Sequence, residues 1–417
     1  RPISARPSCR SRPPGSLHSP QSPMAVDTTT AAPSHPEGDE GGEEAVRPLL
    51  SGAPAEVEDE ELDIRYAPYA RRDAYGPMGR GPLSAAQVAR LVLAGVVLLP
   101  LRLVAGVLLV VAYYLVCRVC TLFVGGVGEG RPRLQGLRRE AVLRAGRVLS
   151  RAMLFVFGFY WIPVSDRSFP NAEDVPKDHY EELERPGAIV SNHVSYVDIL
   201  YHMSASSPSF VAKNSVSKLP LIGLISKCLG CIFVQRESKC SDSKGVSGAV
   251  TERLHEVSQD ENSPMILLFP GTNLRIHELG GKEGRRTAAA AAEGTTTNGD
   301  YLLPFKTGAF LARAPLQPVI LRYPCRRFSP AWDSMDGARH VFLLLCQFAN
   351  YIEVVRLPVY YPSEQEKQDP RVYANNVRKL LATEGNLVLS NLGLAEKRVY
   401  HAALNGNSPR ALHQKDD

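Results

Sequence analysis

A histidine and an aspartate lie five positions apart in the segment Asn192 to Asp198, directly after the apolar run Gly187 to Val190. The apolar run predicts a short buried strand, and Tyr196 to Met203 predicts the start of a helix. Residues five apart in an ideal helix point in different directions. We therefore expect His193 in the turn before the helix and Asp198 in its first turn, where the carboxylate reaches the ring. Such a contact fixes the tautomer of the ring and leaves its second nitrogen free to take a proton from an alcohol.

Two later segments carry groups suited to chemistry on a phosphate-bearing substrate. The apolar stretch that begins at Gly230 ends at Arg236, whose guanidinium can hold a phosphate through two hydrogen bonds. Lys213 is a second candidate phosphate contact, although an exposed structural lysine fits equally well. Met265 to Pro270 predicts a strand ending in proline, and Glu293 to Gly299 predicts a polar turn. The histidine–aspartate spacing alone also fits a structural histidine, so the interpretation depends on these segments occurring together.

In order along the chain, these segments resemble the glycerophospholipid acyltransferases, whose blocks are NHxxxxD, GxxFxxR, FPEGT and a later apolar segment with proline. The first two blocks match Asn192 to Asp198 and Gly230 to Arg236, and Leu316 to Ile320 looks like the fourth. The resemblance covers roughly residues 151–400. Within this family the chain is similar to the plant lysophosphatidylethanolamine acyltransferases, in a form without EF-hand repeats.

The resemblance implies transfer of an acyl chain from acyl-CoA to the free hydroxyl of a lysophospholipid, with lysophosphatidylethanolamine as the expected acceptor. It implies His193 as general base, Asp198 as the group that orients it, and no cofactor or metal besides the co-substrate acyl-CoA. Ser195 is expected to cap the following helix rather than to act as a nucleophile, because the lipid hydroxyl itself attacks. Lysophosphatidate or glycerol 3-phosphate is the alternative acceptor. Substrate contacts are expected from Asn192, Gly230, Phe233, Arg236, Glu293, Gly294 and Thr295.

The third block of the family is interrupted in this chain. Pro270 should continue directly into Glu-Gly-Thr, but Glu293 follows only after the 22 residues from Gly271 to Ala292. This segment is rich in Gly, Arg and Ala and has no periodic apolar face. We predict that residues 271–292 are a retained intron, because excising it can restore the block in frame; a genuine surface insertion is the alternative. With the segment present, we expect reduced activity or a catalytically impaired membrane protein.

Composition limits the other classes of function. The net charge of +5 over 417 residues is too small to indicate nucleic-acid binding. We predict that residues 1–23 are a translated leader before Met24, and that residues 24–85, with their acidic runs, form a disordered tail. The eight cysteines are expected to be reduced thiols, and we take Cys228 and Cys231 as an isolated pair that does not bind metal.

Residues 86–126 contain the membrane signal. The apolar stretch Leu91 to Cys117 is longer than the roughly 20 residues that span a bilayer. Pro100 favours a kink, and Arg102 is costly in hydrocarbon, so one tilted helix and a re-entrant hairpin both fit. We expect amphipathic interfacial helices over residues 127–165, contact with a lipid bilayer, and location in the endoplasmic reticulum membrane with a cytosolic catalytic domain.

Strand and helix signals alternate through the rest of the chain, which predicts an α/β fold with a mixed, largely parallel sheet. The expected catalytic domain covers residues 166–400, and residues 401–417 are expected to be a tail. In such a sheet, active sites lie at the carboxyl ends of the strands. The expected strands are Ala188–Val190, Ser209–Val211, Ile232–Val234, Met265–Phe269, Val319–Leu321 and Ile352–Leu357.

Overall fold

The computed structural model describes residues 55–124, 134–168, 186–234, 252–254, 257, 263–269, 295–325 and 327–406. Within these residues, a seven-stranded sheet has the order β1-β8-β7-β2-β5-β3-β4. All neighbouring strands are parallel except β7 and β8, which run antiparallel. The predicted α/β class with a mixed, largely parallel sheet is therefore confirmed. The strands are β1 (Val164–Asp166), β2 (Ala188–Ser191), β3 (Ser209–Lys213), β4 (Ile232–Val234), β5 (Ile266–Leu268), β7 (Leu316–Arg322) and β8 (Glu353–Arg356).

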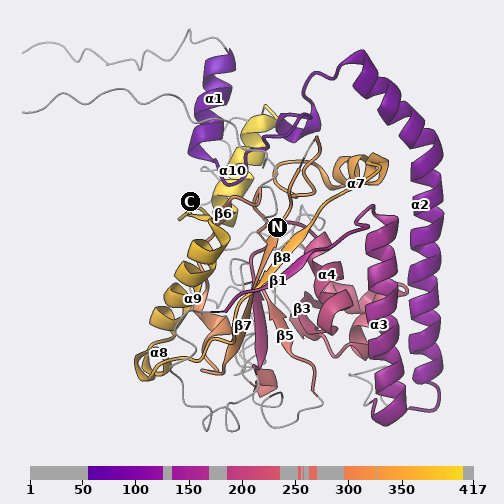
Figure 1. Ribbon diagram of the computed structural model, residues 1–417, viewed down its shortest axis with the longest axis vertical. Coiled ribbons are helices and arrows are strands. Elements are labelled where there is room, and N and C mark those ends of the chain that lie inside the picture. The colour runs from indigo at the N-terminus through magenta and orange to yellow at the C-terminus, as the bar shows by residue number, and fades with distance from the viewer. Residues whose placement is uncertain are drawn as a thin grey trace, which may run out of the picture.

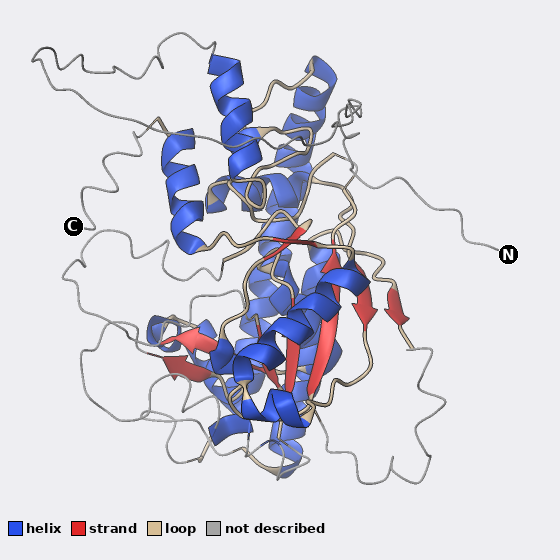
Figure 2. Ribbon diagram, turned by 90° about the vertical axis from the view of Figure 1, so that its left-hand side faces the viewer, coloured by secondary structure: helices blue, strands red, loops and turns tan. Residues whose placement is uncertain are grey.

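The central strands β2, β5 and β7 are mostly apolar because both faces of the sheet are covered. Ala188 and Val190 of β2 point into the core cluster that contains α9 (Pro370–Gly385). Ile189, between them, points into the opposite cluster, which contains residues of α4 (Val197–Ser206) and α7 (Gly337–Cys346). Figures 1 and 2 show helices on both sides of the strands. The result is a three-layer α/β/α domain.

The remaining described helices are short or peripheral. They are α1 (Ala55–Arg65), α5 (Ile222–Cys228), α8 (Glu364–Gln368) and α10 (Leu394–Leu404), in addition to the two long helices described next. A second, two-stranded sheet pairs β6 (Tyr301–Leu302) with β9 (Val388–Leu389). The sequence analysis did not predict β1, β6 or β9. Each has at most three residues, too few to show an alternating pattern.

The membrane signal forms α2 (Ala85–Cys120), which is helical through Pro100. The alternative of a hairpin within residues 86–126 is therefore wrong: this stretch is one helix up to Cys120. It is the one helix among the described residues that is long and apolar enough to cross a membrane. The chain then turns back into α3 (Gly136–Val156), which packs along α2 (Figure 1). Residues 127–165 thus hold one described helix rather than several, and their last two residues already belong to β1.

Arg102 lies in the middle of α2 and is buried. Its guanidinium faces the end of α7, where the helix dipole leaves carbonyl oxygens that attract a cation. The close approach requires Gly158, whose φ is +89° and whose added Cβ would lie 3.2 Å from Arg102 Nη2. This pairing removes the cost expected for an arginine in an apolar helix. The guanidinium donates to the carbonyls of Leu345, Gln347 and Phe348 and to the Tyr160 hydroxyl.

The predicted disordered tail is wrong for its last part. Residues 55–85 include α1, and Tyr66, Tyr69 and Ala70 are buried in an apolar cluster with Leu303 and Tyr400. The acidic composition hid this because a few aromatic side chains are enough to anchor a short segment against an existing domain. The C-terminal boundary also differs, since α10 continues to Leu404. The predicted leader, residues 24–54 and the proposed intron lie outside the described residues.

Candidate active site

The turn between β2 and α4 carries the histidine and the aspartate. His193 follows the carboxyl end of β2, and Asp198 lies in the first turn of α4. Asp198 Oδ2 accepts hydrogen bonds from the backbone N–H groups of Val194 at 2.7 Å and Ser195 at 2.9 Å. These amides at the start of a helix have no helical partner, and an acidic side chain there is favourable. The turn is thus folded around the carboxylate.

The same oxygen of Asp198 contacts the ring of His193. The distance from His193 Nδ1 to Asp198 Oδ2 is 2.9 Å, so the predicted contact is present. The Asp198 side chain is fully buried, whereas 12% of the His193 side chain is exposed. Since an ionised carboxylate only accepts, Nδ1 carries the ring hydrogen and Nε2 keeps its lone pair. The geometry thus gives a candidate base whose Nδ1 is held by Asp198 and whose Nε2 takes no part in that contact.

Phe269, which follows β5, fixes the plane of the His193 ring. The two rings stack with centroids 4.0 Å apart and an interplanar angle of 13°. His202 lies one helical turn after Asp198 in α4. Its ring is T-shaped to the Phe269 ring, with the two centroids 6.2 Å apart. Burial lowers the pKa of His202 to about 4, so it stays neutral at physiological pH. His202 therefore adds no positive charge beside the catalytic candidate.

The sequence analysis missed Tyr323, which follows β7 at the same edge of the sheet. Its hydroxyl donates to Asp198 Oδ1, the carboxylate oxygen that does not contact His193. β2, β5 and β7 are parallel neighbours, so His193, Phe269 and Tyr323 all leave the sheet at one edge. The tyrosine lies just beyond the apolar segment that resembles the fourth family block, and only its place beyond that strand could have indicated it.

The side chains of Asn192 and Ser195 make hydrogen bonds within and beside the turn. Asn192 is buried; its Nδ2 donates to the Leu321 carbonyl at 2.9 Å, and its Oδ1 accepts from the Leu321 N–H at 2.8 Å. This pairing fastens the turn to β7 and gives Asn192 a structural role, while its predicted substrate contact stays a prediction. Ser195 is fully buried, and its Oγ accepts from the Val197 N–H at 3.4 Å. That contact is consistent with a role at the helix start.

The residues predicted from the second block lie apart from this turn. Gly230 ends α5 with a φ of +72°, a conformation that favours glycine, so its identity has a backbone reason. Phe233 packs on the apolar cluster shared by α2 and α5. Neither placement supports the predicted substrate contact. Arg236 lies outside the described residues, as do Glu293 and Gly294, and the side chain of Lys213 is also not described.

Thr295 is the described end of the third block and lines a small cleft beside His193. It is 3% exposed, and its Oγ1 has no hydrogen-bond partner among the described residues. Leaving a buried hydroxyl unpaired is costly, so such a group at a cleft indicates a ligand contact. The placement agrees with the predicted substrate role of Thr295, which stays a prediction.

A larger, apolar cavity of about 430 Å³ reaches the turn that carries His193 and Asp198. Its walls come from α2, α3, α4, α5, β3 and β5, and His193 and Phe269 lie on its lining. The cavity is lined mainly by aliphatic side chains, among them Leu109, Met153, Leu200, Met203, Ile225 and Leu267. His193 and Phe269 line both spaces, so the candidate base lies where an apolar cavity and a more polar cleft meet.

Two backbone segments form hydrogen bonds with the turn that carries His193 and Asp198. The Thr297 N–H donates to the His193 carbonyl at 3.2 Å, and the Trp332 N–H donates to the Val194 carbonyl at 2.8 Å. Both segments are held by residues 66–73, which the sequence analysis placed in the disordered tail. Asn298 Nδ2 donates to the carbonyls of Ala67 and Ala70 at 2.8 and 3.0 Å.

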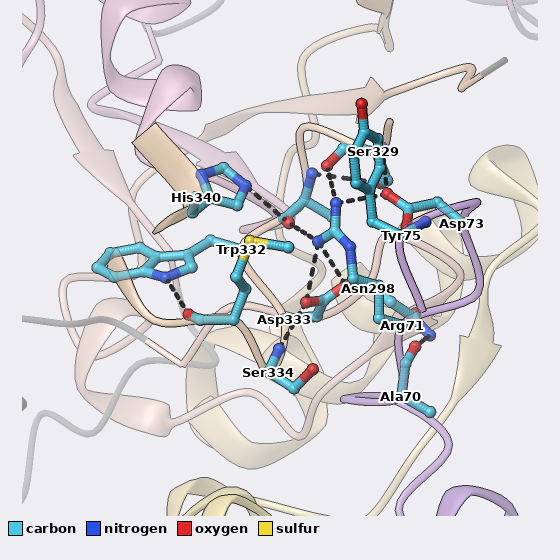
Figure 3. A network of polar contacts seen from close by, with 12 residues as sticks. Ala70, Arg71, Asp73, Tyr75, Asn298, Ser329, Trp332, Asp333, Ser334 and His340 are labelled. Carbon is cyan, nitrogen blue, oxygen red and sulfur yellow. Dashed lines mark hydrogen bonds and ion pairs between the residues drawn. The ribbon is translucent and has the colours of Figure 1, made fainter. Parts of the chain in front are cut away.

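Arg71 is the centre of this support (Figure 3). Its buried guanidinium pairs with Asp73 at 2.5 Å and with Asp333 at 3.1 Å. It also donates to the carbonyls of Ser329 at 2.7 Å and Ala331 at 3.2 Å, on the loop that continues to Trp332. Residues 66–73 thus fix the loop from Ser329 to Trp332, which contacts the turn that carries His193 and Asp198.

The cysteines differ from the expectation in two ways. Cys117 and Cys120 form a second pair with CxxC spacing, so Cys228 and Cys231 are not isolated, and all four belong to or pack on one apolar cluster. Cys325 is disulfide-bonded, so the expectation of reduced thiols is wrong for this residue. Among the described residues, no group of three or more His, Cys, Asp or Glu side chains is arranged to hold a metal ion.

Comparison with known proteins identifies the family to which the chain belongs. The family model described as Acyltransferase matches residues 167–322. The chain is 53% identical over 401 residues to the lysophospholipid acyltransferase LPEAT1 of Arabidopsis thaliana, covering 89% of this chain and 95% of that protein. It is 31% identical to Arabidopsis LPEAT2 and 32% identical to a zebrafish (Danio rerio) lysophosphatidylcholine acyltransferase; these matches cover 64% and 62% of this chain but only 42% and 44% of those relatives. The turn that carries His193 and Asp198 and the cavity-lining strands β3 and β5 fall inside the matched region, and the chain belongs to the lysophospholipid acyltransferases.

Proposed function

We propose that this protein transfers an acyl chain from acyl-CoA to the free hydroxyl of a lysophospholipid, with His193 as general base and Asp198 orienting it. The observation that carries the proposal is the position of His193 between the apolar cavity and the small cleft. An acyl chain and a polar acceptor can approach the same imidazole from two sides. Lysophosphatidylethanolamine is the proposed acceptor, supported by the resemblance to plant lysophosphatidylethanolamine acyltransferases.

The proposed reaction needs one proton transfer at His193. Nε2 takes the proton of the lipid hydroxyl while the lipid oxygen attacks the thioester carbonyl carbon. The carbon–sulfur bond then breaks, and coenzyme A leaves with the proton that the imidazolium returns. Asp198 stabilises the imidazolium through the hydrogen bond to Nδ1, which is 2.9 Å long. The Thr295 hydroxyl, buried and unpaired at the cleft, is the proposed polar contact for the acceptor.

The apolar cavity is the proposed site of the acyl chain. Burying one CH₂ group contributes about 0.8 kcal/mol, so a mainly aliphatic cavity binds a chain far better than a head group. Its walls include Leu109 and Tyr113 of α2 and Met153 of α3. The helices expected to contact lipid therefore also line the path by which a lipid chain would reach His193.

A bilayer is the proposed environment of α2. The helix has 36 residues, about 54 Å at 1.5 Å per residue, and the hydrocarbon core of a bilayer is about 30 Å thick. One side of α2 contacts α3, α5 and α7, so the domain packs along the helix. Phe155 and Phe348 are exposed and pack on Tyr160, which bonds Arg102, so they add apolar surface beside the middle of α2. Location in the endoplasmic reticulum with a cytosolic catalytic domain is part of the proposal. The exposed apolar side of α2 includes Val92, Leu93, Val96, Val97, Leu101, Val104, Val107 and Leu108.

The test is acylation of a lysolipid panel by microsomes that contain the protein, with labelled acyl-CoA as donor. The panel holds lysophosphatidylethanolamine, lysophosphatidylcholine, lysophosphatidate and glycerol 3-phosphate. Three forms are compared: the chain as it stands, His193→Ala, and a form that lacks residues 271–292. Microsomes without the protein give the background.

We expect the form without residues 271–292 to be the most active, with lysophosphatidylethanolamine as the preferred acceptor, and His193→Ala made in that form to fall to background. A preference for lysophosphatidate or glycerol 3-phosphate would contradict the proposed acceptor. Activity that survives His193→Ala would contradict the proposed base. Equal activity with and without residues 271–292 would contradict the expectation that this segment impairs the enzyme.

A further inference from the structure

The Asp198 carboxylate is buried to an unusual degree for a charged group, since none of its surface is exposed. Removing a carboxylate from water is costly unless hydrogen bonds replace the lost hydration. Three donors meet Oδ2: the His193 ring and the N–H groups of Val194 and Ser195. The donor that the structure gives to Oδ1 is the hydroxyl of Tyr323. The two carboxylate oxygens therefore bind different partners.

We infer that Tyr323 is a positioning residue for the acyl transfer: by holding Oδ1 it fixes the rotation of the Asp198 carboxylate and so the strength and direction of its hydrogen bond to His193. The inference rests on the proposed function of His193 as base and goes beyond it. The geometry carries it, because a carboxylate held at both oxygens cannot turn about its Cβ–Cγ bond without losing a hydrogen bond.

The tyrosine is itself fixed by its surroundings. It follows β7 directly, and its ring packs edge-on against Phe159 with centroids 6.2 Å apart. Burial and the neighbouring carboxylate raise the pKa of Tyr323 well above its ordinary value, so the hydroxyl keeps its hydrogen and donates. Tyr196, which precedes α4, also acts on Tyr323, and His202 of α4 faces the same Asp198 carboxylate. His202 is neutral above pH 4, and burial likewise raises the pKa of Tyr196.

Removing the hydroxyl has a defined consequence. In Tyr323→Phe, Oδ1 loses its donor while the ring and its packing remain. The carboxylate is then less well solvated, so its charge attracts the imidazolium more strongly and the protonated base persists to higher pH. Its rotation is then held only by the three donors at Oδ2, so the base is less well oriented, and we expect this loss to outweigh the stronger attraction. We expect kcat to fall about 10-fold, the effect of one hydrogen bond, with little change in KM for the lysolipid.

The matched control is Tyr373→Phe. Tyr373 is also buried, and its hydroxyl donates to the Ala314 carbonyl at 2.8 Å, but it lies on α9 at the opposite face of the sheet. Both changes remove one hydroxyl from one buried tyrosine. They differ in whether that hydroxyl reaches Asp198.

The parent protein is the form, with or without residues 271–292, that proves more active in the lysolipid test. The experiment measures kcat and kcat/KM from pH 5 to pH 9 for this parent and for its Tyr323→Phe, Tyr373→Phe and His193→Ala variants. The assay uses detergent micelles with lysophospholipid and acyl-CoA. For Tyr323→Phe we expect the lower plateau together with an acid limb displaced to higher pH, while Tyr373→Phe keeps the original limb. The position of the limb does not depend on how much protein has folded. A Tyr323→Phe limb that stays in place, whatever the plateau, would overturn the inference. If His193→Ala remains active, the proposed base is wrong and the inference about Tyr323 falls with it; an inactive His193→Ala with an unmoved Tyr323→Phe limb overturns the tyrosine alone.

Discussion

Replacing Asp198 by asparagine removes the charge behind His193 while keeping the shape of the side chain. The amide oxygen can still accept from the Val194 and Ser195 N–H groups, and the amide nitrogen can donate to the Tyr323 hydroxyl. The turn should therefore fold as before. In the proposed mechanism, what is lost is the attraction between the carboxylate and the imidazolium that would form when His193 takes the lipid proton.

The size of the loss follows from the geometry. Two unit charges separated by the 2.9 Å between His193 Nδ1 and Asp198 Oδ2 attract by about 6 kcal/mol at an effective dielectric constant of about 20. If the imidazolium is fully formed in the transition state, this corresponds to a loss of roughly 10⁴-fold in kcat. With about half of the charge developed, the loss is roughly 10²-fold. We therefore expect Asp198→Asn to reduce kcat by about 10²- to 10⁴-fold with KM nearly unchanged.

The assay is acyl transfer to lysophosphatidylethanolamine at saturating acyl-CoA, with protein amount measured by immunoblot. Asp336→Asn is the matched control, because Asp336 also accepts backbone N–H groups at a helix start but is exposed and caps α7. This control should retain full activity. An Asp198→Asn enzyme that keeps more than about one tenth of the original kcat would refute the electrostatic role assigned to the carboxylate.

Three other outcomes are expected. Arg71→Met leaves two buried carboxylates unpaired and should cost about 3–5 kcal/mol of stability, seen as a lower midpoint of thermal inactivation in detergent; the exposed Arg72→Met should have no such effect. Burial lowers the pKa of His202 and of His340 to about 4, so the unfolded chain binds more protons than the folded one between pH 6.5 and 4. The free energy of unfolding should therefore fall as the pH drops through this window, by about 2 kcal/mol per histidine at pH 5. A midpoint of thermal inactivation that is unchanged from pH 7 to pH 5 would contradict this. Ser150→Leu adds bulk to the apolar cavity and should favour shorter acyl donors, by about 4-fold in kcat/KM for each CH₂ displaced; an unchanged preference among acyl-CoA chain lengths would show that the acyl chain does not bind there.

The sequence predicted the main strands because their residues are apolar on both faces. Ala188 to Val190 and Ile266 to Leu268 are short, continuous apolar runs, the pattern typical of a strand that is covered on both faces. The contact of His193 with Asp198 was also predictable. A turn followed by the first helical turn is a local arrangement, and the five-residue spacing is enough to bring the two side chains together.

Contacts between segments far apart in the sequence needed the tertiary structure. Tyr323 reaches Asp198 across 125 positions, and nothing near either residue indicates the pairing. Arg71 reaches Asp333 across 262 positions, and its surroundings in the sequence resemble a disordered tail. Asn192 illustrates the same limit in the other direction: its place in the family block suggested a substrate contact, but the strand order puts Leu321 beside it.

For this protein, the local pattern determined which residues are candidates for the chemistry, and the tertiary structure determined what holds them and which cavity lies beside them. Spacing and strand signals are properties of neighbouring residues, so one chain is sufficient to read them. The cavity beside His193 exists only because α2 and α3 pack against α4 and α5, which brings together residues from Leu109 to Phe269. Burial and hydrogen bonding depend on that packing, and no local pattern encodes it.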